Sequence, residues 1–213
     1  MHTKTLYLIR HGQVVGAGDE RRYLGQHDVP LNDLGQRQAM AVGRWLCDRN
    51  ISRLFCSDLS RTMATAAAVG RFLCLVAEPQ SAWREINMGK WDGRTWKEVA
   101  ALYPDELVRR NTDLVGFRPP GGESFDDCAD RVWAALRDIL ELSEDNVAVV
   151  AHAGVNRLLL CQLLGIPRNN MFRLIQDYGC VNILRCGDWG CQAELINYCP
   201  EWEENGNEPM SPM

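Results

Sequence analysis

A short apolar run near the start of the chain stops abruptly at two polar residues and a glycine. Leu6 to Ile9 has the composition of a buried strand, and Arg10, His11 and Gly12 follow it directly. The strand therefore delivers a cation and an imidazole to its carboxyl end, where Gly12 lets the main chain turn tightly or approach a ligand. A solvated Arg-His pair is the plainer interpretation of the dipeptide alone. In open α/β sheets, however, ligands bind at this edge.

Strand and helix patterns alternate along the rest of the chain. Strands are predicted at residues 5–9, 53–56, 73–77 and 147–151, with closing strands at 181–185 and 191–196. Helices are predicted at 33–48, 59–73, 96–103, 105–110, 124–142 and 154–164, and a loop at 83–95. The run Val147 to Ala151 is apolar throughout, which is typical of a central parallel strand. The alternation predicts an α/β fold, a three-layer sandwich with a mostly parallel central sheet flanked by helices.

Length and composition indicate one globular domain. The chain has 213 residues, of which 1–199 are expected to form the domain and 200–213 an acidic, frayed tail. A net charge of −5 gives no support for a nucleic-acid partner. No apolar run is long enough to span a membrane, and the first residues lead into a strand without a secretory signal pattern. We therefore expect a cytoplasmic protein with no nucleic-acid and no membrane partner.

The cysteines do not form a recognisable framework. Their number is nine, and none is part of a Cys-x-x-Cys motif, which favours free thiols in a reducing compartment over disulfides. One group near the end of the chain has the residue type of a metal site but not the spacing of a common zinc site: Cys180, Cys186, Cys191 and Cys199. The prediction is that no metal binds there.

Polar residues follow several of the predicted strands at the point where each strand ends. Arg10 and His11 follow the first strand, Arg61 lies in the first turn of the helix after the second, and His152 follows the strand that ends at Ala151. Parallel strands place their carboxyl ends at one edge, so these side chains can converge. Arginines bind phosphate oxygens in a bidentate manner, and the helix N-terminus after His152 adds main-chain N–H groups. The sequence therefore predicts a phosphate site.

Six ordered motifs carry a resemblance to a known family. They are Leu8-Ile9-Arg10-His11-Gly12, Gly25-x-x-Asp28-x-Pro30-Leu31, Cys56-Ser57-Asp58-Leu59-x-Arg61, Glu85-x-x-x-Gly89-x-Trp91-x-Gly93, Pro119-Pro120-Gly121-Gly122-Glu123-Ser124 and Val150-Ala151-His152-Ala153-Gly154-Val155. In this order the chain resembles the histidine phosphatase superfamily, which includes cofactor-dependent phosphoglycerate mutases. The resemblance covers about residues 4 to 197.

The resemblance implies a role for each matching residue. His11 would be the nucleophile that forms a phosphohistidine, with its tautomer fixed by a main-chain acceptor. Glu85 would protonate the leaving oxygen and then activate water, although in its own context it reads as a surface carboxylate. The phosphoryl oxygens would be held by Arg10, Arg61, His152 and the N–H of Ala153. No metal or cofactor is expected, because these groups supply the positive charge.

The chain departs from the family pattern near the nucleophile. Many relatives carry an asparagine that donates to the phosphate where this chain has Ala17. The missing donor is expected from Gln13, Gln26 or Asn156, or from water. The residues expected to contact the rest of the substrate are Gln13, Gln26, Tyr23 and Trp91. Four aromatic residues could stack on a base or serve only as packing: Trp83, Trp91, Trp96 and Phe117.

The resemblance also narrows the reaction. Mutases of the family carry Arg-His-Tyr-Gly after the acid and a longer insertion, whereas Ile86-Asn87-Met88-Gly89 follows Glu85 here, so water is the expected acceptor. The glycine-rich segments look most like those of bacterial α-ribazole phosphatases, which remove the 5′-phosphate of the ribazole nucleotide in cobalamin biosynthesis. A broad-specificity sugar phosphatase, a phosphoglycerate mutase and a non-catalytic binding protein are the alternatives. The expected partners are a small phosphorylated metabolite and, as a homodimer, a second copy of the chain.

Overall fold

The computed structural model describes residues 3–17, 20–142 and 146–201, and its centre is one sheet. The strands of this sheet are β1 (Lys4–Arg10), β2 (Ile51–Cys56), β3 (Glu78–Pro79), β4 (Asn146–Ala151), β5 (Val181–Gly187) and β6 (Gly190–Tyr198). Their spatial order is β3-β2-β4-β1-β5-β6. The strands from β3 to β1 pair in parallel, whereas β5 and β6 run antiparallel to their neighbours. The mostly parallel sheet and the central position of β4 are thus confirmed.

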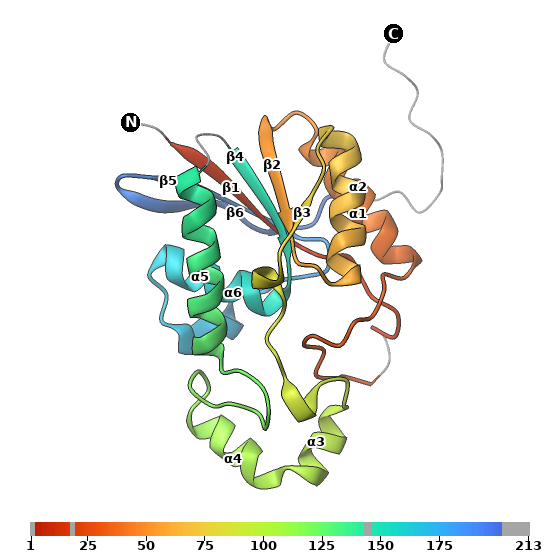
Figure 1. Cartoon of the computed structure of the whole chain (residues 1–213), viewed down its shortest axis with the longest axis vertical. Coiled ribbons are helices and arrows are strands. Elements are labelled where there is room, and N and C mark those ends of the chain that lie inside the picture. The colour runs from red at the N-terminus through yellow and green to blue at the C-terminus, as the bar shows by residue number, and fades with distance from the viewer. Residues whose placement is uncertain (1–2, 18–19, 143–145, 202–213) are drawn as a thin grey trace.

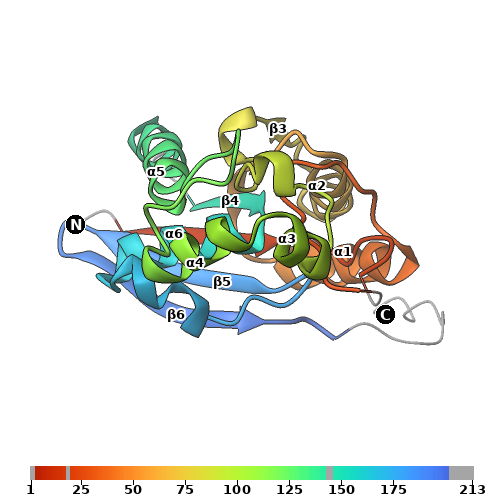
Figure 2. The same cartoon turned by 90° about the horizontal axis from the view of Figure 1, so that it is seen from below.

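Helices cover both faces of the sheet. They are α1 (Asp33–Leu46), α2 (Ser60–Leu73), α3 (Trp96–Leu102), α4 (Pro104–Thr112), α5 (Phe125–Leu142) and α6 (Ala153–Leu164), with short 3₁₀ helices at Ser81–Trp83, Gly89–Trp91 and Arg168–Arg173. Figure 1 shows α5 and α6 on one side of the sheet and α1 and α2 on the other. Seen from below in Figure 2, α3 and α4 lie across the end of the sheet. The predicted three-layer α/β fold is confirmed.

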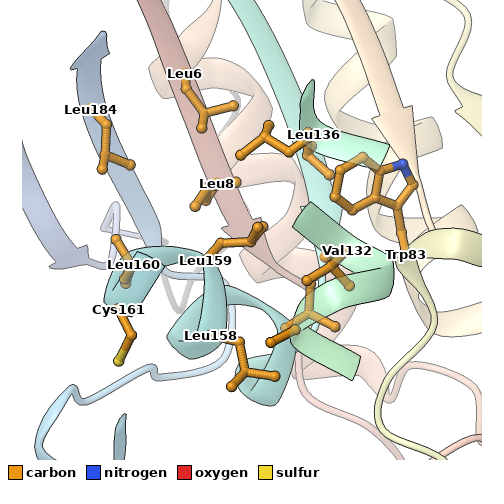
Figure 3. Close-up of a cluster of buried hydrophobic side chains, with 14 of the residues drawn as sticks. Leu6, Leu8, Trp83, Val132, Leu136, Leu158, Leu159, Leu160, Cys161 and Leu184 are labelled. Carbon is orange, nitrogen blue, oxygen red and sulfur yellow. The ribbon is translucent and has the colours of Figure 1, made fainter. Parts of the chain in front are cut away.

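Alternate residues of the strands pack into two separate cores. In β1, Leu6 and Leu8 face α5 and α6, and Tyr7 and Ile9 face α1 and α2. Figure 3 shows the first core, where leucines of β1, α5 and α6 gather and Trp83 lies at the edge of the group. Burying one leucine side chain contributes about 1.5–3 kcal/mol. The paired cores fix the register of the central strands, and with it the positions of the residues that follow them.

Side-chain caps begin the helices close to the predicted residues. Asn32 accepts a hydrogen bond from the Gly35 N–H at the start of α1. At the start of α5, Ser124 and Asp127 each accept a bond from the other's main-chain N–H. These caps satisfy N–H groups that the first turn of a helix leaves free.

The third strand lies further along the chain than predicted. Residues 73–77 are not a strand, and β3 is only Glu78–Pro79. The helix α2 ends because Cys74 takes up a left-handed conformation, and the Leu75 N–H then bonds to the Gly70 carbonyl. Val76 is 90% exposed. The apolar run therefore forms the turn that leaves α2, and the prediction was wrong there.

The expectation of free thiols is wrong for one pair. Cys186 and Cys191 lie opposite each other at the end of the β5–β6 hairpin and form a disulfide. Cys180 and Cys199 lie at the other end of the hairpin, so the suspected cluster is divided into two pairs. Within residues 3–17, 20–142 and 146–201, no three metal-ligating side chains come together.

The ends of the chain are only partly described. The predicted tail falls, from residue 202 onward, outside the described residues. Among the helices that the structure describes, none combines the length and apolar composition that crossing a membrane requires.

Candidate active site

The central pairing of β1 with β4 brings the two histidines together. Arg10 pairs with Ala151, so His11 and His152 are the first residues beyond neighbouring strand ends. The His11 N–H bonds to the Ala151 carbonyl at 3.1 Å, and the two rings lie 5.1 Å apart between centroids. Both side chains are almost completely buried. The sequence-predicted convergence at this edge is therefore present in the structure.

His11 is held as a neutral imidazole with a defined tautomer. Its Nδ1 lies 2.8 Å from the Gly12 carbonyl, which can only accept, so Nδ1 carries the proton. The lone pair is then on Nε2. Burial, and after it the positive charges of Arg10 and Arg61, lower the pKa of His11 well below its usual range. A neutral ring with a bare nitrogen is the form that a nucleophile needs.

His152 takes the complementary tautomer. The Arg61 Nε–H donates to His152 Nδ1 at 3.4 Å, which leaves the ring proton on Nε2. That Nε2 is buried and has no hydrogen-bond partner among the described residues. Burial, then His11 and Arg61, lower the pKa of His152 well below its usual range. His152 therefore offers an unused N–H donor beside the nucleophile.

Arg61 is fixed by main-chain carbonyls rather than by a close carboxylate. Its side chain is 1% exposed, and its Nη2 and Nη1 donate to the carbonyls of Gly25 at 2.6 Å and His27 at 2.9 Å. The Asp92 carboxylate accepts from the N–H groups of Gly25, Gln26 and His27 at 2.8, 2.8 and 3.0 Å. Asp92 thus holds the loop that holds Arg61.

Arg10 is clamped from the opposite side. Its Nη1 donates to the Gln176 carbonyl at 2.6 Å, and its guanidinium lies 3.6 Å above the Tyr178 ring. Its Nε is buried and has no hydrogen-bond partner in the part of the chain that the structure describes. The Tyr178 ring also lies 5.7 Å from that of His11. Two arginines and two histidines therefore surround one small space.

Glu85 lies at the N-terminus of α6. Its Oε2 accepts from the Gly154 N–H and its Oε1 from the Ile86 N–H, both at 3.0 Å. The Arg131 guanidinium of α5 donates to the carbonyls of Ala82 and Arg84, which fixes the segment that leads to Glu85. Glu85 is therefore not a free surface carboxylate. It bonds to Gly154, which is two residues after His152, so its carboxylate lies close to His152.

An open cavity of about 710 Å³ adjoins these residues. Arg10, Ala153 and Tyr178 line it, together with Ala17 and the 50% exposed Trp96. The N–H groups in the first turn of a helix have no partner within the helix, so the Ala153 N–H is available at this wall. The cavity therefore leaves room for a ligand beside Arg10 and the N-terminus of α6.

The two aromatic residues predicted to contact the substrate, Trp91 and Tyr23, differ in their burial. Trp91 is completely buried against Val99 and Phe117, so its ring presents no surface to a ligand. Tyr23 is partly buried and stacks on Trp96, with 5.7 Å between ring centroids. The aromatic side chains in the cavity lining include Trp96 and Tyr178, whereas Trp91 fills the small core under α3.

The predicted amide donors have other partners. Gln26 Nε2 donates to the Glu85 carbonyl at 3.1 Å, and Gln13 Oε1 accepts from Asn32. Asn156 is completely buried and donates to Gln176. The Nδ2 of Asn156 is therefore engaged with another buried side chain.

Sequence reasoning missed Asp92, Tyr178 and Arg157. Tyr178 and Asp92 lie in loops without periodic pattern, so no sequence signal placed them here. Arg157 lines the cavity and follows Ala153 by four residues in α6, a spacing that puts both on one helix face. That signal was present in the sequence.

Known proteins are similar to this chain over most of its length. The sequence profile of the histidine phosphatase superfamily (branch 1) matches residues 6–198. The glucosyl-3-phosphoglycerate phosphatase of Mycolicibacterium vanbaalenii is 34% identical over 179 residues, which are 80% of this chain and 78% of that protein. A probable phosphoglycerate mutase, GpmB of Yersinia pestis, is 34% identical over 173 residues, 79% of each chain. The crystal structure of the α-ribazole phosphatase from Shigella flexneri has a TM-score of 0.85 at 26% identity, over 94% of this chain and 100% of that chain.

Proposed function

The chain belongs to the histidine phosphatase superfamily, and from this membership we propose that it hydrolyses a phosphate monoester through a phosphohistidine at His11. The observation that carries the proposal is the pair of complementary tautomers. His11 presents a bare Nε2, whereas His152 presents an Nε2–H that no protein group among the described residues uses. One ring can attack phosphorus while the other donates to a phosphoryl oxygen.

The first step transfers the phosphoryl group to the protein. The His11 Nε2 lone pair forms the N–P bond as the bond from phosphorus to the ester oxygen breaks. Arg10, Arg61, the His152 Nε2–H and the Ala153 N–H stabilise the charge on the three other oxygens. Glu85 in its protonated form gives its proton to the leaving alcohol.

The second step returns the protein to its starting state. Glu85, now ionised, accepts a proton from water, and the water oxygen attacks phosphorus as the N–P bond breaks. Orthophosphate leaves, and Glu85 carries a proton again. The two N–H bonds that hold Glu85 keep its carboxyl group at the α6 N-terminus through both steps.

Two substrate classes have support, and they differ in the charge of the alcohol. The glycine-rich motifs and the similarity to the Shigella flexneri protein support α-ribazole 5′-phosphate, whose base would stack on the half-exposed Trp96. The similarity to a glucosyl-3-phosphoglycerate phosphatase supports a sugar-acid phosphate, and the arginines that line the cavity give that class an electrostatic reason. In both cases the partner is a small phosphorylated metabolite.

A side-by-side assay tests the proposal. Phosphate release is measured from α-ribazole 5′-phosphate, glucosyl-3-phosphoglycerate, sugar phosphates and 3-phosphoglycerate, the last also with a bisphosphate primer to detect mutase activity. We expect hydrolysis by the wild type and a loss of more than about 1,000-fold in His11→Ala. Thermal unfolding of the variant checks that it is folded. A wild type that releases no phosphate from any of these, or a variant with near wild-type rates, would refute the proposal.

A further inference from the structure

The cavity beside the phosphate site is strongly positive although the chain as a whole is acidic. Its lining includes four arginines, Arg10, Arg21, Arg22 and Arg157, in a chain of net charge −5. The acidic residue in the lining is Glu20, and Lys97 neutralises it at 2.8 Å. Positive charge is therefore concentrated where the alcohol part of a substrate would lie.

Arg157 differs from the exposed arginines in how it is held. It lies on α6, is partly buried, and its Nε donates to the Leu174 carbonyl at 2.8 Å. No carboxylate within the described residues forms an ion pair with it, and Nη1 and Nη2 have no hydrogen-bond partner there. Burial, and after it the charge of Arg10, lower the pKa of Arg157. Glu85 and Asp177 act on this pKa in the opposite direction, but neither carboxylate bonds to the guanidinium among the described residues.

Arg157 is not needed to hold a phosphate at His11. That phosphate is already met by Arg10, Arg61 and His152. With Nε bonded to the main chain, Arg157 keeps the end of its guanidinium, Nη1 and Nη2, for a ligand in the cavity. Two parallel N–H groups at this end match the two oxygens of a carboxylate or phosphate.

We propose that the alcohol released by this protein carries a second acidic group, a carboxylate or a further phosphate, and that Arg157 binds it through Nη1 and Nη2. The inference rests on the proposed phosphatase function and deepens it. Arg157 is then the specificity residue that favours a sugar-acid or bisphosphate substrate over α-ribazole 5′-phosphate, which has no second anion. Trp96 is a further part of the cavity lining.

Two pairs of substrates with the same skeleton test the inference. One pair is 3-phosphoglycerate and glycerol 3-phosphate, which differ in the carboxylate; the other is fructose 1,6-bisphosphate and fructose 6-phosphate, which differ in the second phosphate. We expect kcat/KM of the wild type to favour the acidic member of at least one pair by about 10- to 100-fold, the usual value of a charged hydrogen-bonded contact. The pair that shows the preference identifies the source of the acid group.

Variants of Arg157 assign that preference to one residue. Arg157→Met should remove it by lowering kcat/KM for the acidic member alone, and Arg157→Lys should keep part of it. Arg137→Met, an exposed arginine of α5, is the matched control and should change neither member. Thermal unfolding of each variant is measured, because Arg157→Met also loses the bond to Leu174.

Hydrolysis of p-nitrophenyl phosphate, which has no second acid group, distinguishes a failure of the Arg157 inference from a failure of the proposed phosphatase function. Normal hydrolysis of this ester, with equal kcat/KM within both pairs or with an unchanged preference in Arg157→Met, overturns the inference and leaves the proposed function standing. Failure of the wild type to hydrolyse any ester overturns both.

Discussion

The main-chain N–H of Gly154 donates to the Glu85 carboxylate at 3.0 Å, across 69 residues of sequence. A Cβ atom at position 154 would lie 2.5 Å from Glu85 Oε1 and 2.7 Å from Ile86 Cδ1. The carboxylate can occupy its place only because residue 154 has no side chain. The glycine therefore positions the group that we assign to proton transfer.

Gly154→Ala should impair proton transfer without weakening α6. Alanine is the better helix former, so a loss cannot come from helix propensity. We expect kcat for alkyl phosphates to fall by about 10- to 100-fold, a part of what general acid–base catalysis contributes. The loss should be smaller for p-nitrophenyl phosphate, whose leaving group needs no proton.

The double variant with Glu85→Gln is the control for this assignment. If the two residues act as one unit, Gly154→Ala should cost little more once Glu85 has been replaced. Additive losses, or equal losses for both kinds of leaving group, would show that Gly154 does not act through Glu85.

Asp92→Asn should weaken the binding of phosphate, although Asp92 does not line the cavity. The carboxylate accepts three main-chain N–H bonds from the loop whose carbonyls hold Arg61. An amide at this position can accept through one oxygen only, so the loop loosens. We expect the inhibition constant of orthophosphate to rise by about 10-fold, the value of one charge-assisted bond.

Asp113→Asn is the matched control, because Asp113 also accepts a main-chain N–H, from Gly116 in an exposed turn. It should leave the inhibition constant unchanged. If the Asp92→Asn protein binds orthophosphate as tightly as the wild type, Asp92 does not position Arg61 for phosphate binding.

The buried neutral histidines should make the protein less stable in mild acid. The pKa values of His11 and His152 are lowered well below the usual range in the folded state, mainly by burial. The unfolded chain takes up protons on both rings below about pH 6.5, and the folded chain does not. Their contribution is therefore fully present above that pH and is lost as the pH falls, by up to about 2.7 kcal/mol per pH unit for both rings.

Urea unfolding between pH 7.5 and 5 measures this dependence. His152→Gln should reduce the slope of unfolding free energy against pH by about half, since one titrating ring is gone. His27→Gln, at an exposed position, is the control and should leave the slope as it is. A wild-type free energy that is flat over this range would contradict the neutral, buried state of the two rings.

The parts of the site that sequence could predict are those fixed by the sheet. Arg10, His11 and His152 follow strands, and parallel pairing in register leaves little freedom in where the next residue goes. Arg61 follows from the same logic, because it lies in the first turn after a strand end. The strand pattern and the family resemblance together predict these four positions.

The parts that could not be predicted come from loops. Tyr178 reaches Arg10, and Asp92 reaches residues 25–27, over long separations in sequence that no periodic pattern encodes. Trp91 was expected near the substrate because it lies in a family motif. A motif gives no information on burial, and the Trp91 ring is buried against Val99 and Phe117. Of the aromatic residues named from the sequence, Trp96 is the one that lines the cavity.

The central claim is that His11 attacks phosphorus with Nε2, because Nδ1 is committed to the Gly12 carbonyl. The most direct test is to quench turnover in alkali, where phosphohistidine survives, and to locate the phosphoryl group by phosphorus NMR and peptide mapping. Glu85→Gln lacks the base for hydrolysis, and with p-nitrophenyl phosphate the first step needs no proton from Glu85. In this variant and with this ester the intermediate should accumulate on Nε2 of His11, and His11→Ala should show none. Label on Nδ1, label on His152, or turnover without any phosphohistidine would contradict the account.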